Sequence, residues 1–296
     1  GGVDESADLG RYLYEYFPAT GKCRGTGVWS QGLATCLLQS VSQVTDMEGG
    51  RTFAVAAEMG AAYLMSLQNL DGRNQKAFGG FREHNPQDAW SYPRDGATGG
   101  FALAAMYKMT GAAEYLERAK LFCEWYSGPG SDDETWPYDF YDFAKGEGSC
   151  KVPGDWQAGG ALVYLYTAKC AGDDGWIEKG FRPVMRKLLE IGDPTAVDGA
   201  EHLWHGQSRI TVGNDDFATI VLMGAFLQFE DEAYLDLVRK RLRWMMSLQD
   251  ENGSFPNSGG TFVTALTMLE FCDLVEKKGL PDDTGEIVKL KRLNHA

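Results

Sequence analysis

The 296-residue sequence predicts an all-α fold, a series of helical hairpins arranged as a solenoid or a closed ring. The first observation is a repeated element sharing Met-Ser-Leu-Gln, which spans Tyr63–Gly72 and recurs 181 residues later at Trp244–Gly253. The second is Asp95–Gly100, which recurs 60 residues later as Asp155–Gly160, each copy leading into an apolar run. A third polar start, Asn214–Asp216, follows Asp155 by 59 residues, and 181 is close to three such periods.

Apolar residues at helical spacing predict the individual helices. Leu9, Leu13 and Phe17 share one face of a first amphipathic helix predicted over residues 4–17, which Pro18 and Gly21 then end. Further helices are predicted at 29–44, 52–70, 100–110, 113–127, 158–171, 176–191, 217–229, 232–249 and 260–275.

Two kinds of helix alternate along the chain. Those at 100–110, 158–171, 217–229 and 260–275 are apolar almost all round, whereas 113–127, 176–191 and 232–249 carry charge on one face. A helix that is apolar all round is buried, and a one-sided one faces water. We therefore expect an inner and an outer ring of helices in one domain over residues 1–296.

Composition excludes several classes of protein. A net charge of −14 makes nucleic acid an unexpected partner, because binding a phosphate backbone needs a basic face. No apolar run reaches the length of a membrane span, and six cysteines without Cys-x-x-Cys spacing predict neither a metal nor another cofactor. Gly1-Gly2 resembles a cloning remnant, and the absence of a leader is compatible with an exported or a cytosolic protein.

Connections from inner to outer helices are short, whereas those from outer to inner helices, near 70–94, 129–154 and 192–214, are long. Long ordered loops are usually functional, and these would emerge on one face where the inner helices begin. The expected catalytic residues on that face are Asp95, Asp155, Asp215, Asp216 and His205. The expected substrate-binding residues are Trp29, Trp90, Tyr92, Arg94, Trp136, Trp156, Gln157, Glu201, His202, Trp204, Arg209 and Asn214.

The acids have a structural interpretation beside the catalytic one. Asp95 and Asp155 are good helix N-caps, and capping alone would explain an acid at a helix start. The segment Asn214–Asp216 offers three polar groups where one cap is enough, which favours a functional role for Asp215 or Asp216. Carboxylates that crowd one another can divide into a protonated acid and an ionised base, as glycosidic cleavage requires.

Three other patterns are interpreted without a phosphate or metal site. Gly99-Gly100 and Gly159-Gly160 are expected to be close-packing positions of inner helices. The stretch from Glu201 to His205 has the wrong order and spacing for a His-Glu-x-x-His zinc site, so no metal is expected there. His202, His205 and Arg209 are expected instead to orient substrate or to bind a uronate.

The repeated Ser-Leu-Gln-x-x-x-Gly element, with Gly79-Gly80-Phe81 after its first copy, resembles the glutamine-tryptophan type repeat of the terpene-cyclase and protein-prenyltransferase superfamily. The resemblance covers most of the chain at the level of architecture. It implies a single (α/α)5–6 toroid of helical hairpins.

The stretch Ile210–Ala218 resembles two further patterns. It is similar to the Ile-Thr-x-Asn-Asp stretch of the all-helical pectate lyases, with Gly213 as an extra residue. It also resembles the Asp-x-Asp-Asp-Thr-Ala motif of class II terpene cyclases, which would make Asp215 a proton donor, although Gly213 and Phe217 depart from that motif. The Asp-led inner helices beside aromatic loops are similar to α/α-barrel glycoside hydrolases, including those acting on unsaturated uronyl oligosaccharides.

Together these features favour an enzyme that cleaves glycosidic bonds in an oligo- or polysaccharide. Trp90, Trp136, Trp156 and Trp204 would form stacking walls for sugar rings. Hydrolysis is favoured over elimination because a lyase must neutralise a uronate and the long loops hold few arginines. A cyclase-like isomerase and a non-catalytic binding toroid are the other hypotheses that remain open. If the protein is an enzyme, its expected partner is a small-molecule or oligosaccharide substrate.

Overall fold

The computed structural model describes residues 9–13, 15–45, 47–150, 155–193, 215–247, 249, 251 and 258–281. Side chains are not described at residues 15–16, 22–24, 47–48, 155–156, 215–216 and 258–263. Contacts divide the chain into two compact units, residues 1–150 with 160–183 and residues 151–159 with 184–296, which are treated in turn.

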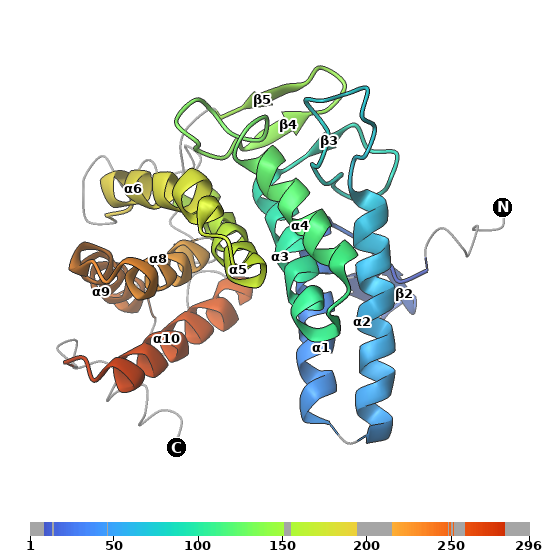
Figure 1. The fold of residues 1–296 in the computed structure, drawn as a ribbon. Helices are drawn as coiled ribbons and strands as arrows, with labels where there is room; N and C mark the ends of the chain where they lie inside the picture. The colour runs from blue at the N-terminus through green and yellow to red at the C-terminus, as the bar shows by residue number, and fades with distance from the viewer. Residues whose placement is uncertain are drawn as a thin grey trace. The chain divides into compact units, whose positions relative to one another are not determined.

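The first unit is built from two helical hairpins and a further helix (Figure 1). Helix α3 packs between α1 and α5, while α2 pairs with α1 and α4 pairs with α3. This agrees with the predicted alternation, since α3 is buried over most of its length and α4 presents charged residues to water. The helices are α1 (Val28–Val44), α2 (Met47–Leu67), α3 (Pro93–Thr110), α4 (Ala113–Tyr126), α5 (Leu162–Ala171) and the π-helical turn η2 (Ile177–Phe181).

Local sequence explains how α3 begins and ends. Pro93 occupies the first turn, where the missing N–H costs nothing, and Gly111 ends the helix with φ of 72°. A Cβ on Gly99 would lie 3.1 Å from the side chain of Val28, and one on Gly100 would lie 2.8 Å from the ring of Phe122. The prediction that these glycines permit close packing is confirmed.

The first Ser-Leu-Gln copy joins neighbouring outer helices. Gln68 is 4% exposed, and its Nε2 donates to the carbonyl of Gly79 at 2.9 Å and to that of Arg118, on α4, at 3.0 Å. The glutamine thus satisfies two backbone carbonyls while it fixes the end of α2 against α4. Tyr63 is also buried, and its hydroxyl donates to the carbonyl of His84 at 3.1 Å.

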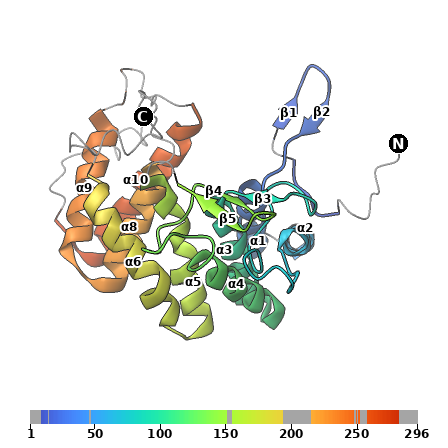
Figure 2. The same cartoon turned by 90° about the horizontal axis from the view of Figure 1, so that it is seen from above.

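The predicted helix over residues 4–17 is wrong within the described residues. Residues 15–17 form strand β1 (Glu15–Phe17), which pairs antiparallel with β2 (Lys22–Arg24) through a turn that includes Pro18 and Gly21. Figure 2 shows this hairpin standing away from the helices of the first unit. Pro18 and Gly21 therefore lie in the turn of a β-hairpin and do not end a helix.

A three-stranded sheet orders the long loops of the first unit. It comprises β3 (Trp90–Ser91), β4 (Phe140–Asp142) and β5 (Glu147–Ser149), with β4 in the centre and all pairs antiparallel. In Figure 1 this sheet lies across one end of α3 and α4. The loop before α3 and the loop after α4 are therefore held together at the position where the predicted site residues cluster.

The second unit is also helical. It contains most of α6 (Arg182–Ile191), with α8 (Asp215–Phe229), α9 (Glu232–Ser247), α10 (Ser258–Lys278) and most of the 3-10 turn η1 (Asp155–Ala161). Helix α8 packs against both α9 and α10. Arg241 is 1% exposed, and it donates from Nη1 to the carbonyl of Gly192 at 2.8 Å and from Nε to Oγ1 of Thr219 at 2.9 Å.

The helices predicted from 29 onward are present, with shifted ends. The largest differences are at the starts of α2 and α3, and at the irregular turns η1 and η2, which precede α5 and α6. No helix in the described part of the chain is long and apolar enough to cross a membrane.

Candidate functional site

Glu83 lies where two helices of the first unit begin. Its carbonyl accepts from the N–H of Val28, the first residue of α1, at 2.8 Å. Its Oε2 accepts from the N–H of Tyr92, the N-cap residue of α3, at 3.1 Å. The other oxygen, Oε1, would lie 3.5 Å from a Cβ on Gly27, beside the ring of Trp29. The start of α1 therefore holds the backbone of Glu83, and the start of α3 holds its carboxyl group.

Burial controls the charge of Glu83. The residue is 2% exposed, and desolvation, assisted by the negative charge of Asp95, raises its pKa to about 8. The N–H of Tyr92 and the charge of Arg94 oppose this shift, but they are the smaller effects. Glu83 is therefore a protonated acid at neutral pH, which is a property associated with functional sites.

Asp95 supplies the second carboxyl group. It lies in the first turn of α3, is 7% exposed, and its Oδ1 accepts from Nε of Arg94 at 2.9 Å and from Nη2 at 2.8 Å. No hydrogen bond to its Oδ2 occurs among the described residues. The N-cap position belongs to Tyr92, so the expectation that Asp95 is the N-cap residue of this helix is wrong.

An aromatic wall stands beside the two carboxyl groups; we use this name for Trp90, Tyr92 and Phe140. Trp90 pairs with Asp142 across the sheet, and Ser91 with Tyr141, so alternate residues put the wall on one face. The ring of Trp90 stacks on that of Phe140 with centroids 5.8 Å apart, and meets that of Tyr92 edge-on at 5.1 Å.

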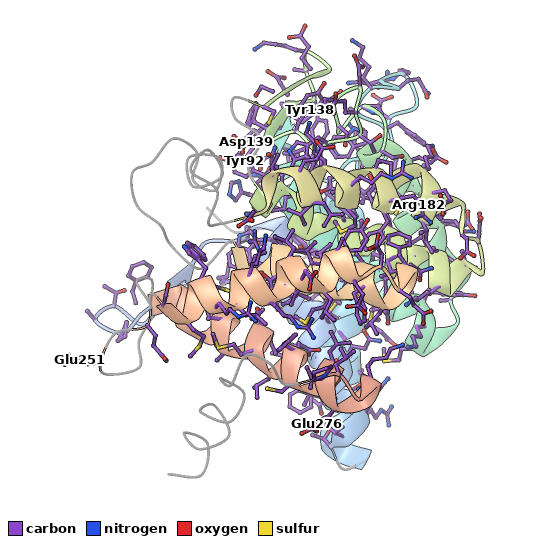
Figure 3. All side chains as sticks on the ribbon, turned by 90° about the vertical axis from the view of Figure 1, so that its left-hand side faces the viewer. Tyr92, Tyr138, Asp139, Arg182, Glu251 and Glu276 are labelled. Atoms are coloured by element: carbon purple, nitrogen blue, oxygen red, sulfur yellow. The ribbon has the colours of Figure 1, made fainter. Side chains whose placement is uncertain are left out.

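The outer part of the wall is open to solvent. Tyr92 is 40% exposed, and burial together with Glu83, Asp139 and Asp95 raises its pKa. Figure 3 shows Tyr92 and Asp139 next to each other. The ring of His84 approaches Trp90 edge-on at 5.1 Å, and its Nδ1 lies 3.3 Å from Oδ2 of Asp88. A protonated acid, an ion-paired carboxylate and an open aromatic surface are thus brought together.

The structure brings together several of the predicted residues. Asp95, Arg94, Trp90 and Tyr92 gather around Glu83, with Trp29, which is 39% exposed, on the α1 side. Trp136 differs from the prediction: it is 1% exposed, so its ring is packed in the interior rather than offered as a stacking surface.

Other predicted residues belong to the second unit or are not described. Gln157 is fully buried in η1. The backbones of Asp155, Trp156, Asp215 and Asp216 begin η1 and α8, but their side chains lie outside the described residues. Glu201, His202, Trp204, His205, Arg209 and Asn214 lie outside the described residues altogether.

Sequence reasoning missed Glu83, Asp88 and Phe140. Glu83 follows the Gly79-Gly80-Phe81 segment, and an acid so close to an apolar, glycine-rich turn was the one available signal. Among the described residues, no group of three or more potential ligands is placed to hold a metal ion.

No model of a known protein family matches the sequence, and no curated protein matches it. Solved structures do. A sugar epimerase from a ruminal bacterium matches with a TM-score of 0.71 and 15% identity, over 99% of this chain and 80% of that one. A cellobiose 2-epimerase from Bacillus thermoamylovorans matches with a TM-score of 0.69 and 15% identity, over 96% and 80%. A GH76 alpha-mannanase from Bacteroides thetaiotaomicron matches with a TM-score of 0.61 and 12% identity, over 98% and 79%.

These matches establish the fold. The chain is an all-α protein with the α/α-toroid fold, as the sequence predicted. The toroid architecture that the sequence resemblance implied is therefore confirmed as a fold. At such low identities the comparison concerns architecture alone.

Proposed function

We propose that this protein is a carbohydrate-active enzyme that hydrolyses glycosidic bonds in an oligo- or polysaccharide. The observation that carries the proposal is Glu83, a buried acid with a pKa of about 8, beside Asp95, a carboxylate paired with Arg94. Glycosidic cleavage uses such a division, in which one carboxyl group donates a proton and the other acts as base or nucleophile. The fold also supports it, because the named structures of this architecture act on sugars.

In this mechanism, the sugar stacks on the aromatic wall and its glycosidic oxygen receives the proton of Glu83. The bond to the leaving group breaks as Asp95 activates a water molecule or attacks the anomeric carbon. Arg94 holds Asp95 in orientation, because its Nε and Nη2 both donate to the same oxygen, Oδ1. The second oxygen of Asp95 is then the one that serves the reaction.

Epimerisation of a sugar is the second candidate function. It is favoured by one observation: the two epimerases have higher TM-scores than the mannanase. An acid and a base that exchange protons with a sugar carbon would suit that reaction as well. The two candidates differ in product mass, since hydrolysis adds water and epimerisation does not.

The test is a panel of mannan, cellulose-derived and uronate-containing oligosaccharides, with products read by mass and by chromatography of isomers. Glu83→Gln and Asp95→Asn should each lower turnover by about a hundredfold or more, as loss of general acid–base catalysis does. Glu58→Gln, an exposed carboxyl on α2, is the matched control and should leave turnover unchanged.

Each outcome has a defined meaning. Shorter products support hydrolysis, and products of unchanged mass but altered configuration support epimerisation. A new ultraviolet-absorbing double bond would move the assignment to a lyase. Full turnover in Glu83→Gln would remove this residue from the mechanism, and no conversion of any glycan would reject the proposal.

A further inference from the structure

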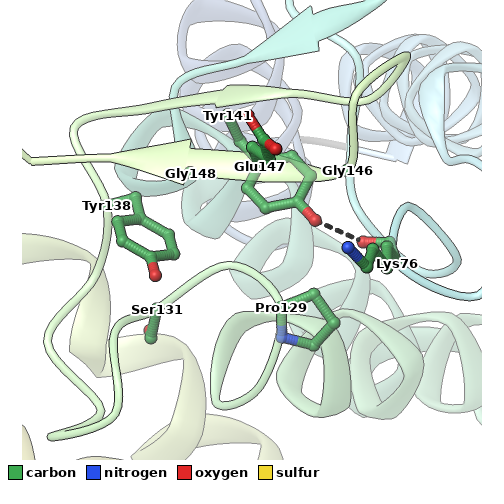
Figure 4. A pocket seen from close by; sticks show the side chains of 8 residues that line it. All are labelled: Lys76, Pro129, Ser131, Tyr138, Tyr141, Gly146, Glu147 and Gly148. Atoms are coloured by element: carbon green, nitrogen blue, oxygen red, sulfur yellow. Dashed lines mark hydrogen bonds between the residues drawn. The ribbon is translucent and has the colours of Figure 1, made fainter.

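A pocket of the first unit lies apart from the carboxyl pair of Glu83 and Asp95. It is a cavity of about 400 Å³ lined by Lys76, Pro129, Ser131, Tyr138, Tyr141, Gly146, Glu147 and Gly148. Three segments contribute to it: the loop after α2, the loop after α4, and the hairpin of β4 and β5. Figure 4 shows Tyr138 on one side and Lys76 on the other, with Pro129 and Ser131 below them.

The β4 strand separates this pocket from the aromatic wall. Phe140 points to the wall, where it stacks on Trp90, whereas the next residue, Tyr141, lines the pocket. Successive side chains of a strand point to opposite faces of a sheet. A ligand in the pocket would therefore not occupy the position of a sugar stacked on Trp90.

The lining is held in place before any ligand arrives. A Cβ on Gly148 would lie 1.9 Å from the ring of Tyr138, so this ring rests directly on the backbone of β5. The carbonyl of Lys76 accepts from the hydroxyl of Tyr141 at 2.9 Å and from Nε1 of Trp125 at 2.9 Å. Ordered lining groups lower the entropic cost of binding.

Three polar groups of this lining have no partner within the described residues. The ammonium group of Lys76 and the carboxylate of Glu147 form no ion pair there, and the hydroxyl of Tyr138 makes no hydrogen bond. One cation and one anion leave the lining without net charge. Burial, together with the nearby carboxylates of Asp132 and Asp133, raises the pKa of Tyr138. A phosphate or a uronate would be repelled by these carboxylates, whereas the hydroxyl groups of a neutral sugar can both donate and accept.

We propose that this pocket is an accessory binding site for a neutral saccharide unit, stacked on Tyr138 and hydrogen-bonded by Lys76 and Glu147. The choice of glycans as ligands rests on the proposed function, but binding here requires no turnover. A long chain held at this pocket would be retained near the carboxyl pair of the same unit. A short substrate would gain nothing from it.

The test is calorimetric titration of the full chain carrying Glu83→Gln, which is expected to slow conversion of the ligand, with mannotetraose, cellotetraose and tetragalacturonate as probes. Adding Tyr138→Ala should weaken binding of a neutral tetrasaccharide about tenfold, which corresponds to about 1.4 kcal/mol. Gly148→Ala should do the same by displacing the ring. Tyr115→Ala, on α4 outside the pocket, is the matched control and should bind as the parent does.

A second readout separates binding from catalysis. In the chain with Glu83 intact, Tyr138→Ala should leave turnover of a disaccharide unchanged and lower the efficiency only on longer chains. Equal affinity of the Tyr138→Ala and Tyr115→Ala proteins, tighter binding of tetragalacturonate than of the neutral probes, or no binding of any neutral probe would each overturn the accessory site. The role of Glu83 is tested separately, because that experiment measures the products of the reaction and not the affinity for a glycan.

Discussion

Replacing Glu83 by Gln should make the folded protein less sensitive to alkaline pH. The folded state binds the proton of Glu83 more tightly than the unfolded state, because its pKa is about 8 instead of the ordinary 4.5. The contribution of Glu83 to the unfolding free energy is therefore fully present below pH 4.5, and it is lost as the pH rises through 8. The difference corresponds to about 5 kcal/mol between the protonated and ionised states, at about 1.36 kcal/mol per pKa unit.

Glutamine keeps the shape of the protonated side chain and can still accept from the N–H of Tyr92. It cannot ionise, so this contribution to the pH dependence disappears. The wild type should lose roughly 2.5 to 3 kcal/mol of unfolding free energy relative to Glu83→Gln between pH 6 and pH 9, because part of the total is already lost between pH 4.5 and pH 6. Activity should disappear in the same variant, so that a loss of function accompanies a gain of stability at high pH.

The measurement is urea unfolding followed by tryptophan fluorescence at several pH values, for the wild type, Glu83→Gln and the exposed control Glu58→Gln. Taking differences between proteins cancels the titration of all other groups. Parallel pH profiles for the wild type and Glu83→Gln would refute the reasoning, because Glu83 would then be ionised at neutral pH like an ordinary carboxylate. It could not act as the proton donor.

Three further predictions concern packing and substrate binding. Arg241→Ala should lower the unfolding free energy by about 3 to 5 kcal/mol, because it leaves a cavity and takes a hydrogen-bond donor away from the carbonyl of Gly192 and from Oγ1 of Thr219; urea unfolding measures this loss. Gly100→Ala should cost about 1 to 3 kcal/mol by forcing a methyl group against Phe122, whereas Gly72→Ala, with nothing within 4 Å, should be nearly neutral in thermal unfolding. Tyr92→Ala should raise KM about tenfold with an unchanged melting temperature, since an exposed ring of the wall is removed and its backbone N–H stays; an unchanged KM would show that the substrate does not touch this ring.

Much of the helical architecture follows from the sequence because its causes are local. Periodic apolar residues predicted α1 and α4 almost to the residue. The same rule failed at residues 4–17, where the spacing of Leu9, Leu13 and Phe17 suits a helix but the chain pairs Glu15 with Arg24 instead. Pairing across a turn competes with helical spacing, and short segments do not decide between them.

The site was only partly predictable because its main property is not local. Asp95 and Tyr92 stood out at a helix start, but the acidity of Glu83 comes from burial by residues far away in the chain. The sheet that carries the aromatic wall was also missed, since Trp90 and Asp142 are 52 positions apart and their strands are two or three residues long. Such pairings are tertiary, and propensity does not reveal them.

The position of Glu83 between two helix starts links chemistry to assembly. Its backbone is bound to Val28 and its side chain to Tyr92, so the acid exists as an acid only when α1 and α3 are packed together. A chain in which that packing has loosened would carry an ordinary, hydrated glutamate that gives up its proton well below neutral pH. Incompletely folded molecules would then be catalytically inactive. The onset of turnover during refolding would mark the moment at which the first two hairpins dock.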